Sequence, residues 1–191
     1  AAILSEFTQR NRGALSVFVL AVHDQANMYL LDMLSYMNRG DTLAARKGRW
    51  TIPDTMDRLH LGLSRPVLTG MELRFAGSGV ECFPILSPNL YLDRPLVFYG
   101  RYPVEEKRVV FQVAGRAGDQ FYDMVFDLPM ETALRGDESI REEWAWHKIY
   151  TLIGRHAVAG DLQALQELSQ TARRYGLTVP YGERFSSPSP P

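Results

Sequence analysis

The sequence predicts an α+β fold in three parts: a strand and helices of an α/β type, an antiparallel β-sandwich-like middle, and a C-terminal helical pair. Three observations indicate this. A nearly continuous apolar run precedes a segment of helical periodicity, short β-rich runs follow, and two amphipathic helical patterns come last. We place the parts at 1–64, 65–130 and 131–185, and a disordered Pro-rich tail at 186–191.

The first part predicts a buried strand followed by two helices. The run from Leu15 to Val22 (residues 15–22) is apolar almost without interruption, which is typical of an internal strand covered on both faces of a parallel sheet. Apolar residues at helical spacing then predict a helix over 28–37, which Asn38-Arg39-Gly40 ends. A second helix is predicted over 53–63, with Pro53 in its first turn.

The middle part predicts antiparallel strands separated by Gly, Pro, Asn and Asp. The β-rich runs lie at 67–75, 80–85, 95–102, 108–114 and 120–128. In the last run apolar residues alternate with Asp123 and Asp127, which predicts one apolar face and one largely wet face. The apolar positions are Tyr122, Met124, Phe126 and Leu128. The hairpin turn before this run is predicted at 115–119.

The third part predicts two amphipathic helices, over 138–153 and 162–175, with Asp161 as the N-cap of the second. Trp144 and Trp146 lie in the first of these helices. Residues two apart lie on different faces of a helix, so the two tryptophans are not expected to form one surface. We interpret both as packing anchors against the β-region.

Composition and charge exclude some classes of partner. Lys and Arg total 21 against 22 for Asp and Glu, so a net charge of -1 provides no field that attracts nucleic acid. No apolar run approaches the roughly 20 residues needed to cross a bilayer, and we expect no membrane insertion. The chain starts without an initiator methionine or a secretion-signal pattern, which is typical of a processed or cut product with sequence upstream. The compartment stays undecided.

His23 and Asp24 are the best-placed polar pair. They follow the predicted strand and precede a helix, at the edge where ligands bind in open α/β sheets. The favoured alternative is that Asp24 caps the helix while His23 is a surface turn residue. Adjacent side chains also point apart on an extended backbone, so the pair does not form a dyad by proximity.

Two further candidates lie elsewhere in the chain. Arg46, Lys47, Arg49 and Trp50 form a compact basic and aromatic cluster that would suit a phosphate or an acidic partner, although a solvated loop is the default interpretation. Cys82 is the single cysteine. A lone thiol without a clear His and Asn or Asp context is typically a small buried apolar residue rather than a nucleophile.

Several segments together indicate a family. The stretch VFVLAVHDQANMYLLDMLSYMNRG at 17–40 resembles the last strand and helix of von Willebrand factor A domains, in which an Asn opens the helix and an Asn-Arg-Gly or similar triplet closes it. Asn27 and Asn38-Arg39-Gly40 carry this match. EWAWHKI at 143–149 and YGLTVPY at 175–181 are similar to the ending of inter-alpha-trypsin inhibitor heavy chain-like proteins. The matches fall in the family's order.

The resemblance has consequences for metal binding. The family's metal-ion-dependent adhesion site starts with Asp-x-Ser-x-Ser, which gives a hard cation its oxygen ligands, and no such run occurs in this sequence. We therefore assign no metal ligand and no cofactor. The ending VPYGE at 179–183 also lacks the Thr-Ser that commonly follows the tyrosine, so the sequence departs from the closest subfamily there.

The resemblance implies a non-catalytic interaction or scaffold module of a larger von Willebrand factor A-type protein, with an unidentified protein partner. It also implies that the remaining strands of the A-type sheet and of the sandwich belong to preceding sequence. We therefore expect self-association through Leu15 to Val22 or the β-region, or pairing of the lone strand with the β-region. The alternative is a hydrolase-like enzyme that uses His23 and Asp24, or Cys82.

Overall fold

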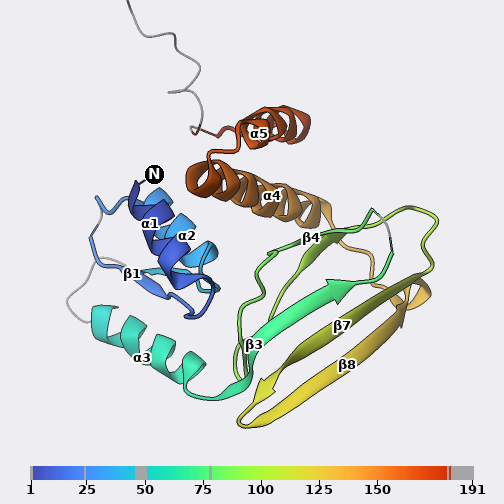
Figure 1. Cartoon of the computed structure of the whole chain (residues 1–191), viewed down its shortest axis with the longest axis horizontal. Helices are drawn as coiled ribbons and strands as arrows, with labels where there is room; N and C mark the ends of the chain where they lie inside the picture. Colours follow the sequence, from blue (N-terminus) through green and yellow to red (C-terminus); the bar gives the residue numbers. More distant parts are fainter. Residues whose placement is uncertain (1, 24, 46–50, 78, 180, 182–191) are drawn as a thin grey trace, which may run out of the picture.

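The computed structural model describes residues 2–23, 25–45, 51–77, 79–179 and 181 (Figure 1). It is α+β, as predicted. Helices with a small parallel sheet form one side, an antiparallel sheet forms the other, and α4 extends from the first toward the second. Among the helices of the described residues, none has the length and apolar character to span a bilayer.

A strand-helix-strand unit forms the centre of the first part. β1 (Val19–Ala21) leads through α2 (Met28–Tyr36) to β2 (Thr42–Ala44), and the two strands pair in parallel. The predicted partial α/β unit is therefore present. The predicted internal strand is wrong in its extent, because Leu15 and Val22 lie outside β1 and are 68% and 56% exposed. The expected pairing with the β-region is also wrong. β1 pairs instead with β2, the strand that follows α2 in the chain.

A pair of buried amides joins α1 (Ala2–Asn11) to the end of α2. The Asn11 side-chain amide donates to the Asn38 Oδ1 atom at 2.7 Å and to the Leu15 carbonyl at 2.8 Å. The Asn38 amide donates in turn to the Leu34 carbonyl at 2.7 Å and to the Thr8 hydroxyl at 3.2 Å. One of these bonds satisfies the Leu34 carbonyl in the last turn of α2, and the others tie α1 to the residues that follow α2.

The N-cap of α2 is Asn27, whose Oδ1 atom accepts from the Leu30 backbone N–H at 3.1 Å. The prediction that Asp24 caps this helix is therefore wrong, since the helix starts four residues beyond it. The resemblance placed an Asn at the helix start, and Asn27 occupies that position. Asn and Asp are both good N-cap residues. Which of them caps α2 therefore depends on where the chain enters the helix and not on the capping preference of the residue type.

The main antiparallel sheet has the strand order β5-β3-β7-β8. Its strands are β3 (Pro66–Phe75), β5 (Leu90–Tyr91), β7 (Arg108–Ala117) and β8 (Gln120–Pro129). β4 (Glu81–Phe83) and β6 (Tyr99–Arg101) form a separate antiparallel pair. The turn between β7 and β8 consists of Gly118, with φ at +60°, and Asp119, within the predicted range. The short strand β5 was not predicted.

Connections and the last helices complete the chain. α3 (Thr51–Leu63) links β2 to β3, and a short 3-10 helix (Met130–Thr132) follows β8. The predicted helical pair is α4 (Glu138–Ala159) and α5 (Leu162–Tyr175), and Asp161 caps α5 as predicted by accepting from the Ala164 N–H at 3.2 Å. The main core lies between α1, α2, α4 and α5. Its buried members are Leu4, Met33, Ile149, Leu152, Ile153, Ala164 and Leu168.

α4 also attaches to the β-region, through Trp144 and Lys148. Trp144 is 3% exposed, packs edge-on against Phe83, and donates its indole N–H to the Glu81 carbonyl at 3.2 Å. Lys148 pairs with Glu81 at 2.6 Å and with Glu167 of α5 at 2.8 Å. Trp144 is thus the predicted anchor on the β-region, whereas Trp146 packs among the helices instead.

Candidate functional site

His23 is a surface turn residue. It lies two residues after β1, its side chain is exposed, and its Nδ1 atom accepts from the Gln25 backbone N–H at 3.1 Å. This is the alternative that the sequence favoured for His23. Asp24 lies outside the described residues. Among the described residues, therefore, no carboxylate forms a hydrogen bond or an ion pair with His23.

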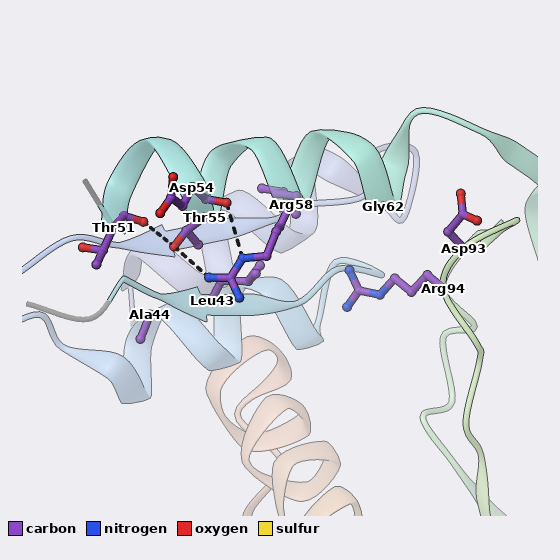
Figure 2. Close-up of a pocket in the computed structure, with 10 residues that line it drawn as sticks. Leu43, Ala44, Thr51, Asp54, Thr55, Arg58, Gly62, Asp93 and Arg94 are labelled. Carbon is purple, nitrogen blue, oxygen red and sulfur yellow. Dashed lines mark hydrogen bonds between the residues drawn. The ribbon is translucent and has the colours of Figure 1, made fainter. Parts of the chain in front are cut away.

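The predicted basic cluster of Arg46, Lys47, Arg49 and Trp50 also lies outside the described residues. The elements on either side of it, β2 and α3, line an open pocket of about 620 Å³ together with a loop at Asp93 and Arg94 (Figure 2).

Three of the charged side chains that line this pocket have partners within the chain. In Figure 2, Arg58 folds back along α3, donating to the Asp54 carbonyl at 3.3 Å and to the Thr55 hydroxyl at 3.4 Å. Arg94 forms an ion pair with Asp41, and Asp93 forms one with Arg65. The lining contains two acidic and two basic side chains, and Arg58, Asp93 and Arg94 among them bond to other residues, which does not favour a site for a specific ion.

Cys82, the candidate nucleophile, is a half-buried thiol in β4. It lines an apolar cavity of about 150 Å³ with Phe75, Phe98 and Val109. Burial raises the pKa of the thiol to about 11, so the group is protonated at neutral pH. A cysteine nucleophile needs a lowered pKa, which these surroundings do not provide.

We expect Cys82 to react slowly with iodoacetamide in the folded protein at neutral pH. The rate should stay low near the ordinary thiol pKa of 9.0 and rise as pH approaches about 11, because the thiolate is the reacting form. Mass spectrometry of the alkylated protein over time measures this rate, and the urea-unfolded chain is the control. Alkylation at neutral pH as fast in the folded as in the unfolded chain would revive the enzyme alternative.

A second cavity, of about 300 Å³, lies where α2, the segment before β6 and α4 meet. Two polar atoms of its lining residues, Arg39 Nε and His147 Nδ1, are buried and have no hydrogen-bond partner in the described part of the chain. Burial lowers the pKa of His147, which also stacks against Tyr99. The imidazole is therefore neutral at neutral pH and packs as an aromatic side chain.

The outer strand of the main sheet, β8, exposes apolar side chains along its length. Every residue from 121 to 128 is exposed, although β8 pairs with β7 along its whole length. The apolar face predicted for this strand is 38% exposed at Met124, 40% at Tyr122 and Phe126, and 49% at Leu128. On β3, two strands inward, Leu68 and Met71 are only 4% and 3% exposed. The sheet is covered at β3 and open at β8.

The structure also brings together three arginines that are far apart in the sequence. Arg101 from β6, Arg141 from α4 and Arg174 from α5 line one open pocket of about 470 Å³. These residues are far apart in the sequence and each belongs to a different element, so no local pattern joins them. An arginine next to an aromatic residue, as at Arg174 and Tyr175, is too frequent to serve as a signal.

No cluster of three or more His, Cys, Asp or Glu side chains suited to a metal ion occurs in the described residues. No family model matches the chain, and no curated protein matches it.

Proposed function

We propose that this chain is a non-catalytic protein-protein contact module, the C-terminal part of a larger von Willebrand factor A-type protein. The observation that carries the proposal is the open edge and apolar face of β8. We further propose that the chain as it stands covers this surface with a second copy of itself. The edge, the face and the charges of β8 each support this occupant.

The first support is the direction of the backbone groups of β8. The Met130 N–H donates to the Lys107 carbonyl at 2.8 Å, so in this ladder the even-numbered residues point their backbone groups at β7. The odd-numbered residues Phe121, Asp123, Val125 and Asp127 consequently direct their N–H and C=O groups away from β7. Among the strands that the structure describes, β8 ends the order of its sheet, so these groups form an open edge that another strand can pair with.

The second support is the match between two copies of β8. Antiparallel pairing about a two-fold axis keeps opposite residues on the same face, so the apolar faces of both copies become continuous. A register centred on Met124 places Tyr122 of one copy opposite Phe126 of the other. Aromatic pairs across strands contribute roughly 0.2–1 kcal/mol each.

The third support is electrostatic. In the same register neither Asp123 nor Asp127 faces another carboxylate across the new strand pair. Asp127 is held by Arg108 at 2.7 Å, and Asp123 accepts from the Gln112 amide at 2.7 Å. The net charge of -1 also creates little repulsion between copies.

We expect the chain to sediment as a dimer and the variant Met124→Lys to sediment as a monomer. The substitution places two ammonium groups opposite each other at the two-fold axis and should raise the dissociation constant by more than about tenfold, equivalent to about 1.4 kcal/mol. Analytical ultracentrifugation across a concentration series measures this constant.

The matched control is Val104→Lys, because Val104 is 99% exposed and lies in the turn before β7, outside β8. It adds the same charge and should leave the dimer intact. Circular dichroism of both variants checks that they fold. A wild-type monomer at high concentration, or a dimer that Met124→Lys leaves unchanged, would overturn the proposed contact.

A further inference from the structure

Three guanidinium groups converge on two aromatic rings at the junction of β6, α4 and α5. Arg101 lies over the Trp144 ring, 4.9 Å from its centroid, and its terminal nitrogen is 3.5 Å from the Tyr175 hydroxyl. Arg141 and Arg174 lie 5.1 Å and 5.9 Å from the centroid of Tyr175. The two rings are themselves 5.7 Å apart. We call these five side chains the Arg-aromatic pocket.

The aromatic base of this pocket is rigid. Trp144 is 3% exposed and is fixed by its hydrogen bond to the Glu81 carbonyl and by its contact with Phe83. Tyr175 closes α5 directly before Gly176, whose φ of +66° ends the helix. Cation-π contacts with rings held in this way place the guanidinium groups before any ligand arrives, which lowers the entropy cost of binding.

The charge of the pocket is positive and accessible. All three arginines are exposed, and within the described residues Arg101 and Arg174 form no ion pair, while Arg141 has a long 3.9 Å contact with Glu138. Asp137 also lines the pocket, but its carboxylate accepts from the Ser139 backbone N–H and hydroxyl at the start of α4. These two hydrogen bonds hold the pKa of Asp137 below its usual range. The arginines therefore keep N–H donors available for carboxylates of a ligand.

We infer that the Arg-aromatic pocket binds an acidic peptide segment of a partner protein. Its volume of about 470 Å³ is open to solvent along three elements, which suits an extended segment with more than one carboxylate. Arg, Trp and Tyr are the residues enriched at the energetic centres of protein interfaces. The inference is independent of self-association through β8, because the pocket lies on other elements.

The test uses a fluorescein-labelled hexaglutamate peptide and measures its anisotropy with increasing protein at low salt. Binding should weaken as salt is added, since the contacts are charged and exposed. The variant Arg174→Gln should raise the dissociation constant by about fivefold, and Arg141→Gln with Arg174→Gln by more than about tenfold.

The matched control is Arg173→Gln, on the same helix and beside Arg174 in sequence. Arg173 is exposed and does not line the pocket, so this variant loses the same charge but should bind the peptide as the wild type does. Equal losses for Arg173→Gln and Arg174→Gln would show nonspecific attraction and would overturn the inference.

A second arm separates carboxylates from phosphates as the ligand chemistry. Pyrophosphate is added to the preformed complex at matched ionic strength. Retention of the peptide supports an acidic segment. Unlabelled hexaglutamate, added in the same way, gives the reference concentration for displacement. If pyrophosphate displaces the labelled peptide at a lower concentration than unlabelled hexaglutamate does, the pocket prefers phosphate groups and the inference is overturned.

Discussion

Gly40→Ala is expected to destabilise the protein by about 3 kcal/mol or more. A Cβ at this position would lie 1.8 Å from the Val17 carbonyl oxygen and 2.4 Å from its carbon. Both atoms belong to the backbone, which is held on either side of the contact. The Val17 N–H donates to the Asn38 carbonyl at 3.0 Å, and the Val19 N–H donates to the Asp41 carbonyl at 2.9 Å. The backbone can move aside only by breaking these bonds.

Urea unfolding followed by circular dichroism measures the change for Gly40→Ala. The matched control is Gly62→Ala in α3, where an added Cβ meets no atom within 4 Å. Alanine is the better helix former by up to about 1 kcal/mol, so this control should be neutral or stabilising. Equal unfolding midpoints for Gly40→Ala and the wild type would contradict the close approach of Val17 to Gly40.

Asn38→Ala is expected to destabilise the protein by about 3 kcal/mol, because each buried polar group that loses its partner costs roughly 1–3 kcal/mol. Asn38 is 0% exposed, and its side chain makes three hydrogen bonds, to Leu34, Thr8 and Asn11. The substitution removes all three and leaves space in a packed site. It also loosens the connection between α1 and the end of α2.

The comparison for Asn38→Ala is Asn27→Ala, which removes one exposed capping bond and should cost about 1 kcal/mol. Thermal unfolding by calorimetry ranks the two variants against the wild type. If Asn38→Ala lowers the stability less than Asn27→Ala does, the buried amide pair is not a principal link between the first two helices.

The two proposed surfaces predict different behaviour in solution. Contact through β8 depends on backbone pairing and apolar area, so it should persist as salt is added, whereas binding in the Arg-aromatic pocket should weaken. Met124→Lys should therefore change the oligomeric state without changing peptide binding. Arg174→Gln should do the reverse.

Local patterns in the sequence determined the kinds of elements and several of their ends. The Asn38-Arg39-Gly40 stop follows α2, the turn at Gly118 joins β7 to β8, and Asp161 caps α5. These features depend on residues within one turn of each other, on backbone angles open to glycine and on side chains that cap the nearest N–H groups. The alternation in β8 likewise followed from the two-residue period of a strand.

Only the tertiary structure decided which surfaces are covered and which distant residues meet. The apolar run from Leu15 to Val22 predicted a fully covered strand, yet among the described residues β1 has a single neighbouring strand, and the apolar face of β8 is open. Apolar periodicity shows which face of a strand or helix is apolar. Whether that face is buried depends on other elements, far away in the sequence, that pack against it. Arg101, Arg141 and Arg174 meet for the same reason: three elements separate in sequence pack around Trp144 and Tyr175. Such contacts depend on packing between elements, which no short sequence window contains.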